Sequence, residues 1–253
     1  DLLQADTGGS ASDNITKDPT IIGLVSDTSP IGSLYVSVDG QPRVAALDQL
    51  AAQDSSSAVG PRFFQLTREE LESYLGGPLW DGTHTITITA ADVHYNTSLP
   101  VQFMFILCSR APAAPSAPDL IAESDTGVSN SDDLTSDSLP TFLVAGAGGD
   151  AVTLYRDGQM MVRAAIEDGQ SLLSGVNLGF VSGILRFTAT TTDLAGNESE
   201  PSPELVVTLD VSPPKRPTLG LDPAFDTNTL TGDTLGDRQT THASVTLAGK
   251  TEP

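Results

Sequence analysis

Acidic and amide side chains recur in two short sequence patterns that could bind a divalent cation. The first pattern, DTGVSNSDDLT, occupies residues 125–135 and has an earlier copy, DTGGSASDNIT, at residues 6–16. The second pattern, DLAGN at residues 193–197, corresponds to DVHYN at residues 92–96. Calcium takes about six to eight oxygen ligands from carboxylates, amide side chains and backbone carbonyls. Carboxylates from two such loops, with a carbonyl from a linker, would meet that demand.

The candidate metal ligands all lie in these loops or directly after a strand beside them. They are Asp6, Asp13, Asp125, Asp132, Asp133, Asp193, Asn197, Asp210, Asp226 and Asp233, the last two from a degenerate third copy that begins DTN at 226–228. Gly127 and Gly8 are expected to let the loop backbone turn through positive φ. The alternative is that the Asp, Ser and Thr side chains only form Asx turns and cap their own loops. Both interpretations remain open at the level of the sequence.

The spacing of the patterns predicts domains in tandem, because self-similarity at a long fixed period marks whole repeated units. Asp92 and Asp193 lie 101 residues apart, whereas the Asp-Gly pairs at 39–40 and 157–158 lie 118 apart. The first copy therefore carries about 17 extra residues relative to this period. We predict domains over residues 1–111, with an insertion at about 52–79, and over 112–213, and an incomplete third domain over 214–253. The proline-rich linkers at 109–118 and 212–217 are expected to be extended and semi-rigid.

Short alternating segments rich in β-branched and aromatic residues predict strands. In the first copy they are residues 33–38, 84–90 and 101–107, and in the second 151–156, 185–190 and 205–209, with residues 243–247 in the third. Each Asp-Gly pair predicts a hairpin turn. About seven short strands per repeat are typical of a Greek-key sandwich. The predicted fold class is all-β, built from tandem immunoglobulin-like Greek-key β-sandwiches.

The insertion in the first copy predicts one short helix. Residues 67–70 (TREE) form a capping box, and the sequence GGP at 76–78 should end the helix. The apolar stripe of this helix would consist of Leu66, Leu71, Tyr74 and Leu75. We expect the helix to lie over one edge or end of the first sandwich.

Strand order predicts which loops meet where two domains join. In a seven-stranded sandwich, the loop after the first strand lies at the end where the chain leaves the domain. The loop before the last strand lies at the end where the chain enters. Asp6 and Asp13 are therefore carried toward Asp193 and Asn197, and the acids near Asp125 face whatever follows. Because the strand ending at Cys108 lacks the acid that follows the strand 205–209, we expect the first junction to bind calcium weakly or not at all.

Composition excludes several classes of protein. A net charge of −21 and only three lysines argue against a nucleic-acid partner, because phosphates must be met by Lys and Arg. The acidic excess fits either a salty or calcium-rich exterior or simple solubility. Cys108 is the only cysteine, so an intrachain disulfide or a cysteine-based zinc site is ruled out. No apolar run reaches the roughly 18 residues of a membrane span, and no signal peptide opens the sequence, so we expect an internal part of a longer protein.

Catalytic motifs are missing from the sequence. There is no G-x-S-x-G elbow and no phosphate-binding G-x-x-x-x-G-K. His84, His94 and His242 stand singly and are interpreted as surface or packing residues. Trp80, the only tryptophan, is predicted to anchor the core. We therefore expect a protein that is not an enzyme.

Four segments together resemble the bacterial immunoglobulin-like (BIg) repeats of giant surface adhesins. They are SDTG at 124–127, the hairpin YRDG at 155–158, DLAGN at 193–197 and the linker VSPP at 211–214. The resemblance covers essentially the whole chain, is clearest over residues 118–217, and extends to the large repeats-in-toxin adhesins of Gram-negative bacteria. It implies a secreted rod at the bacterial cell surface, whose repeats are stiffened by calcium and support adhesion or biofilm formation.

Three functions follow as hypotheses. The first is an extender segment of such an adhesin, whose partners are the neighbouring repeats of the same chain, with a host-cell, glycan or other surface ligand bound by another region. The second is a module that recognises a glycan or peptide through the insertion and Trp80. The third is a set of accessory domains of a secreted hydrolase. None of them involves nucleic acid or insertion into a membrane.

Overall fold

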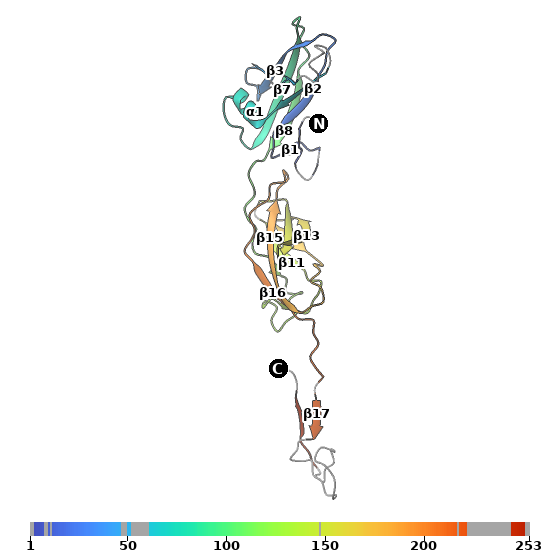
Figure 1. Cartoon of the computed structure of the whole chain (residues 1–253). Helices are drawn as coiled ribbons and strands as arrows, with labels where there is room; N and C mark the ends of the chain where they lie inside the picture. The colour runs from blue at the N-terminus through green and yellow to red at the C-terminus, as the bar shows by residue number, and fades with distance from the viewer. Residues whose placement is uncertain are drawn as a thin grey trace. The chain divides into compact units, whose positions relative to one another are not determined.

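The structure is a computed structural model of the chain (Figure 1). It describes residues 3–7, 10, 12–46, 50–51, 61–146, 148–216, 218–221 and 244–250. The chain divides into two compact units, Asp1–Leu209 and Asp210–Pro253, and each is described by itself. Asp226 and Asp233, two of the predicted ligands, lie outside the described residues, as does Gly8.

The first unit opens with a sandwich of two β-sheets. One sheet has the order β1-β8-β7-β3-β4 and the other β2-β6-β5. The strands are β1 (Ile15–Thr16), β2 (Ile21–Val25), β3 (Ile31–Val38), β4 (Val44–Ala45), β5 (Leu50–Ala51), β6 (Arg62–Leu66), β7 (Gly82–Asp92) and β8 (Val101–Leu107). All neighbours pair antiparallel except β1 and β8, which run parallel.

A second sandwich follows, with the same strand arrangement in its larger sheet. Its sheets have the orders β10-β16-β15-β12-β13 and β14-β11-β9, and β10 again runs parallel to β16. The strands are β9 (Asp119–Leu120), β10 (Leu134–Thr135), β11 (Phe142–Ala145), β12 (Ala151–Arg156), β13 (Gln159–Ala165), β14 (Gln170–Leu173), β15 (Gly183–Thr192) and β16 (Leu205–Leu209). The six strands predicted in these two copies are confirmed, and the all-β immunoglobulin-like fold with them.

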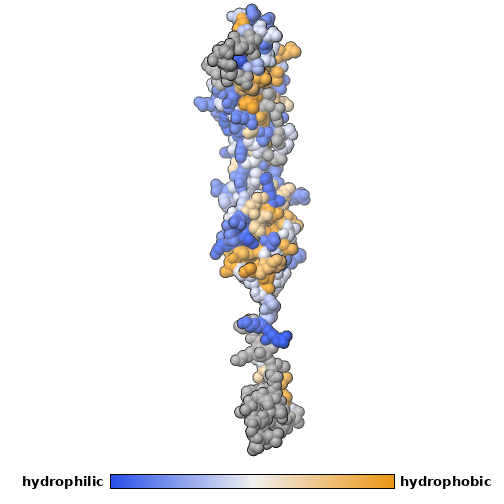
Figure 2. Space-filling model, turned by 45° about the vertical axis from the view of Figure 1, so that its right-hand side comes forward, coloured by the Kyte–Doolittle hydropathy of each residue, from blue (hydrophilic) through white to orange (hydrophobic). Residues whose placement is uncertain are grey.

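Alternating side chains build a separate core in each sandwich. In β3, Leu34, Val36 and Val38 are buried, while the residues between them face outward. In the second sandwich, the rings of Phe142 and Phe187 pack with their centroids 4.7 Å apart. Each such side chain stabilises its sandwich by about 1.5–3 kcal/mol through burial. Apolar side chains also remain on the surface of both sandwiches (Figure 2), for example Phe63 and Ile184.

The two Asp-Gly pairs form the predicted hairpin turns. Asp39 and Gly40 have φ values of 48° and 74°, and Asp157 and Gly158 have 51° and 80°. Two consecutive left-handed residues are the signature of a type I′ turn, whose twist matches that of the strands. These turns join β3 to β4 and β12 to β13.

The predicted helix is confirmed as α1 (Arg68–Leu75), with the capping box formed by Thr67 and Glu70. Leu71 is fully buried, and α1 packs beside β3. The helix ends at Gly76, which is left-handed at φ 79°. One correction concerns the rest of the insertion: β6 lies inside the predicted range 52–79, pairs with β2, and is the counterpart of β14. The extra residues therefore fall in two connections, one before β6 and one after it.

The second unit contains an antiparallel pair of strands, β17 (Thr218–Leu221) and β18 (Leu247–Lys250). The strand predicted at 243–247 is misplaced, since β18 begins only at Leu247. In the part of the chain that the structure describes, no helix is long and apolar enough to cross a membrane.

Candidate functional site

The loop at residues 125–135, here called the acidic loop of the second sandwich, connects β9 to β10. Asp125 is only 4% exposed, and its Oδ2 accepts a hydrogen bond from the Asp133 N–H at 3.1 Å. The Oδ1 of the same carboxylate is buried and has no hydrogen-bond partner. Asp132 instead caps the loop, accepting from the N–H groups of Ser129 and Leu134. The loop thus contains one turn-capping carboxylate and one with an unsatisfied oxygen.

Asp133 carries a perturbed carboxyl group in the same loop. Burial raises its pKa, and the negative charges of Asp125, Asp119 and Asp132 raise it further. Its backbone is left-handed, with φ 56°. Negative charge is therefore concentrated here without a compensating cation from the protein in the described structure.

Gly127 does not have the role predicted for it. It is not among the described residues with positive φ, and the left-handed position of the loop is taken by Asp133. A Cβ on Gly127 would instead lie 2.8 Å from Asp132 Oδ1 and 2.8 Å from the Leu134 carbonyl oxygen. The glycine is required because the loop closes tightly on itself, and not because the chain turns there.

The acidic loop of the first sandwich, residues 6–16, repeats this geometry with fewer charges. Asp6 Oδ2 accepts from the Asn14 N–H at 3.1 Å, and Asp6 Oδ1 is again buried without a partner. Asp13 caps the N–H of Ile15 at 3.0 Å. Asn14, with φ 59°, stands where the second loop has Asp133, so one carboxylate is replaced by a neutral amide.

Asp193 and Asn197 hold together the loop between β15 and β16. The two carboxylate oxygens of Asp193 accept from the backbone N–H and the side-chain amide of Asn197, each at 2.8 Å. The Asn197 amide also donates to the Cys108 carbonyl at 2.7 Å. Asp92 and Asn96 repeat this cap in the first sandwich, and the bond from the Asn96 amide lowers the pKa of Asp92. These side chains carry out the turn-capping role that the sequence left open.

The two loops predicted to face each other do meet. The Thr7 hydroxyl donates to the Ala195 carbonyl at 2.7 Å, and the Lys17 ammonium donates to the Gly196 carbonyl at 2.9 Å. Gly196 is left-handed at φ 79°, and a Cβ there would collide with the Thr7 carbonyl oxygen. Sequence reasoning missed Thr7 and Lys17. The available signal was that Lys17, one of three lysines, replaces the Ser136 of the second copy.

The predicted ligands do not form a complete metal cage among the described residues. Within that part of the chain, no group of three or more His, Cys, Asp or Glu side chains is placed to hold an ion. Asp210 lies in the second unit, where its Oδ1 accepts from the Ser212 N–H at 3.0 Å. An ion at the acidic loop of the second sandwich would need further oxygens from carbonyls, water or a following segment.

Trp80 is not a core anchor, which corrects the prediction. Its side chain is 58% exposed, and its ring lies 5.3 Å from that of His84. His84 is fully buried, with Nδ1 at 2.7 Å from Asp39 Oδ2 and Nε2 at 2.7 Å from the Trp80 carbonyl oxygen. The backbone carbonyl of Trp80 thus contacts the buried His84, while its ring faces solvent.

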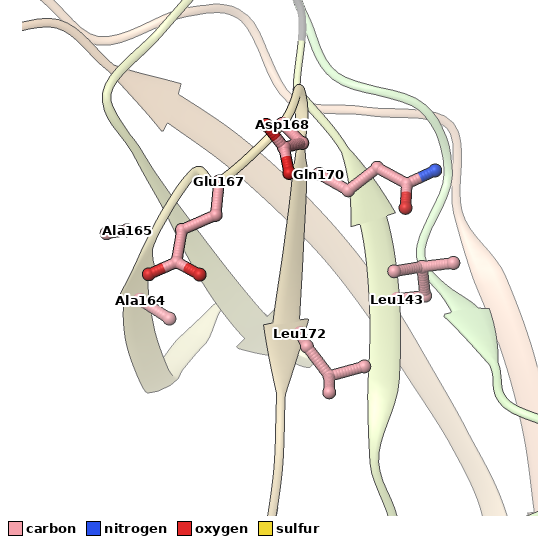
Figure 3. A pocket seen from close by; sticks show the side chains of 7 residues that line it. All are labelled: Leu143, Ala164, Ala165, Glu167, Asp168, Gln170 and Leu172. Atoms are coloured by element: carbon pink, nitrogen blue, oxygen red, sulfur yellow. The ribbon is translucent and has the colours of Figure 1, made fainter.

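One open pocket lies between β13 and β14 in the second sandwich (Figure 3). It has a volume of about 500 Å³ and is lined by Leu143, Ala164, Ala165, Glu167, Asp168, Gln170 and Leu172. Glu167 and Asp168 belong to the turn before β14, and none of the predicted site residues lines the pocket. Among these side chains there are two carboxylates and no cation.

Comparison with known proteins finds a family model that matches one segment of the chain. Residues 111–211 match the family model described as a bacterial Ig-like domain. A search of the curated proteins found no match.

Several solved structures are similar at low identity. The fibronectin(III)-like modules of Clostridium thermocellum CbhA are 11% identical, with 77% of this chain and 87% of that chain covered and a TM-score of 0.42. A tetra-tandem repeat from the extending region of a large adhesion protein is 20% identical, with coverages of 96% and 61% and a TM-score of 0.29. A structure from a 1.5-MDa bacterial ice-binding adhesin is 13% identical, with coverages of 86% and 67% and a TM-score of 0.33. The segment at 111–211 is thus similar in sequence to bacterial Ig-like domains.

Proposed function

We propose that this chain is a non-enzymatic extender segment of a large adhesin at the bacterial cell surface, supporting adhesion or biofilm formation. The observation that carries the proposal is the loop-to-loop contact between successive sandwiches, made by Thr7 with Ala195 and by Lys17 with Gly196. A spacer must transmit orientation from one domain to the next, and direct contacts between domains do this. The family match at 111–211 agrees with the proposal.

We further propose that calcium binds the acidic loop of the second sandwich. The unpartnered Oδ1 of Asp125 supports this, because a buried carboxylate oxygen without a hydrogen bond costs folding free energy unless a cation or water meets it. The charges around Asp133 also support it: burial raises the pKa of Asp133, the neighbouring carboxylates raise it further, and a divalent ion would neutralise those carboxylates. Asp125, Asp132 and Asp133 would supply oxygens, and the ion would oppose carboxylate repulsion.

Thermal unfolding of the full chain with calcium and with a chelator tests this. A ligand that binds only the folded state stabilises it, by about 2.7 kcal/mol at a hundredfold excess over its dissociation constant. We expect calcium to raise the melting temperature of the wild type and to have much less effect on Asp125→Asn. Glu69→Gln, which removes an exposed charge from α1, is the control and should respond like the wild type. A wild type that melts identically with calcium and chelator would overturn the calcium site.

A second candidate function is recognition of a glycan through Trp80. Its 58% exposed ring follows α1, where it could stack on a sugar face. On a glycan array, Trp80→Ala should lose binding, while Tyr95→Ala, which removes an exposed aromatic from another loop of the same sandwich, should retain it. Equal binding by wild type and Trp80→Ala would remove this candidate.

A further inference from the structure

In the part of the chain that the structure describes, hydrogen bonds connect the first sandwich and its linker to the second sandwich, and four of them involve residues 191–197. Two of them join the acidic loop of the first sandwich to the carbonyls of Ala195 and Gly196, as described above. The other two fix the linker: the Asn197 amide donates to the Cys108 carbonyl, and the Thr191 hydroxyl donates to the Ala113 carbonyl at 3.0 Å. All four acceptors are backbone carbonyls, which are also the groups that a calcium ion at such a junction would bind.

The first acidic loop is less negative than the second, and this difference favours a contact with backbone carbonyl oxygens. Residues 6–17 carry two aspartates and Lys17, whereas residues 125–136 carry three aspartates and no cation. Lys17 stands at the position of Ser136, and Asn14 at that of Asp133. Relative to the second loop, the first loop, which contacts the next sandwich, therefore has an added ammonium group and one carboxylate fewer.

Gly196 provides independent evidence that the contact is built into the fold. Its backbone is left-handed, and the Thr7 carbonyl oxygen occupies the space that a Cβ would take. Gly158 has nearly the same φ, 80°, but nothing lies within 4 Å of its Cβ position. The close approach at Gly196 is thus a property of the junction and not of left-handed glycines in general.

We propose that the first junction is a metal-independent joint, in which the Lys17 ammonium takes the place that a calcium ion would occupy. The occupant of the loop surface formed by Thr7 and Lys17 is the turn at 195–196 of the following Ig-like domain. This deepens the proposed extender function and rests on it, since it assigns the two junctions different dependence on calcium. The relative orientation of the two sandwiches is then the same with and without calcium. Calcium acts only on the acidic loop of the second sandwich.

Distance measurement between two spin labels in the full chain tests the joint. The labels go on Gln102→Cys and Gln159→Cys, both exposed and one in each sandwich, in a Cys108→Ser background. With Lys17 present, we expect a narrow distance distribution with calcium and with chelator. Lys17→Met and Thr7→Val should broaden it about two-fold under both conditions, because linked domains move independently when no specific interface holds them.

The matched controls are the same positions of the second sandwich. Thr126→Val and Ser136→Ala remove the equivalent side chains and should leave the distribution narrow. Gly196→Ala should broaden it, whereas Gly158→Ala, with the same backbone strain and no neighbour, should not. Circular dichroism of each variant verifies that both sandwiches remain folded.

The possible outcomes separate this proposal from the proposed function. If the wild-type distribution is narrow only with calcium, or if Lys17→Met leaves it narrow, the metal-independent joint is wrong. The calcium gain in melting temperature, and its loss in Asp125→Asn, are unaffected by either of those results. If instead Lys17→Met broadens the distance distribution while calcium does not raise the melting temperature, the metal-independent joint is supported and the calcium site is wrong.

Discussion

At the scale of single residues, the acidic loops combine two uses of a carboxylate. In Asp6 and Asp125, one oxygen accepts a backbone N–H and the other is buried without a partner. An unsatisfied buried acceptor costs about 1–3 kcal/mol. The repetition of the same unsatisfied oxygen in both sandwiches indicates that the loop geometry itself creates it. Capping accounts for the first oxygen and leaves the second without a protein partner.

Asp133→Asn should stabilise the protein at pH 7 in chelator. Because the folded-state pKa of Asp133 is raised, its ionised form disfavours folding, and this cost grows as pH rises through that pKa. We expect a gain of roughly 0.2–1 kcal/mol, the size of a partly exposed charge interaction. Urea unfolding at pH 7 and at pH 4 measures it, and the gain should shrink at the lower pH.

Asp168→Asn is the matched control for this change. Asp168 is exposed and left-handed at φ 50°, so the variant repeats the same substitution on the same kind of backbone. It should not reproduce the pH dependence of the gain. The electrostatic explanation fails if Asp133→Asn is less stable than the wild type in chelator.

Asp92→Asn should destabilise the first sandwich and make its free energy of unfolding less sensitive to acidic pH. The hydrogen bond from the Asn96 amide lowers the pKa of Asp92, so its stabilisation is complete at neutral pH. This stabilisation is lost as pH falls below the ordinary aspartate pKa of about 4. We expect a loss of stability at pH 7, because hydrogen bonds to a charged group are stronger than those to a neutral one. Denaturation curves from pH 7 to pH 3 provide the measurement, with Glu69→Gln as the control. Parallel pH profiles for Asp92→Asn and the wild type would contradict the prediction.

At the scale of elements, local chemistry decides where strands and helices begin and end. The capping box places the first residue of α1, and Gly76 ends the helix. The Asp-Gly turns set the β3–β4 and β12–β13 hairpins. Side-chain alternation then decides which face of each strand is buried. Strand β6 escaped prediction because it lies in the inserted region, where the repeat gives no register.

Thr67→Ala tests the capping box. The Thr67 hydroxyl accepts from the Glu70 N–H, and Glu70 Oε2 accepts from the Thr67 N–H at 2.7 Å. Loss of an N-cap side chain costs about 1 kcal/mol. We expect that loss in urea unfolding of the first sandwich, followed by the fluorescence of Trp80. Thr28→Ala, an exposed loop threonine of the same sandwich, should change stability far less; an equal loss in both would rule out the cap as the cause.

At the scale of the whole molecule, the two sandwiches have independent cores and a common junction. The core cluster around Phe105 contains only residues of the first sandwich, and Phe142 and Phe187 pack in the second. Hydrogen bonds to backbone carbonyls, together with the glycine at 196, join them. Stability is therefore set within each sandwich, whereas orientation is set at the junction.

Phe187→Ala should destabilise the second sandwich alone. Truncating a fully buried phenylalanine costs about 3–5 kcal/mol. Since Trp80 is the only tryptophan and lies in the first sandwich, its fluorescence should report an unchanged transition while circular dichroism detects an earlier one. Phe105→Ala should have the converse effect. A matching shift of both signals in Phe187→Ala would show that the two cores unfold together.

Local periodicity was sufficient to predict the fold class, six strands of the two sandwiches, the hairpin turns and helix α1. It also predicted that the loop at 6–16 meets the loop at 193–197. These features depend on side-chain alternation, caps and turn residues, which act between residues close in the sequence. The sequence by itself therefore determined the elements, their repetition and the pairing of loops at the junction.

The tertiary structure alone decided what the polar side chains in those loops do. Asp193 and Asn197 were predicted as metal ligands, and they cap their own turn and hold the linker. Thr7 and Lys17 make the contact between sandwiches, and Trp80 is exposed instead of buried. A side chain takes its partner from whichever group lies within about 3 Å, and that distance is set by packing between segments far apart in the chain.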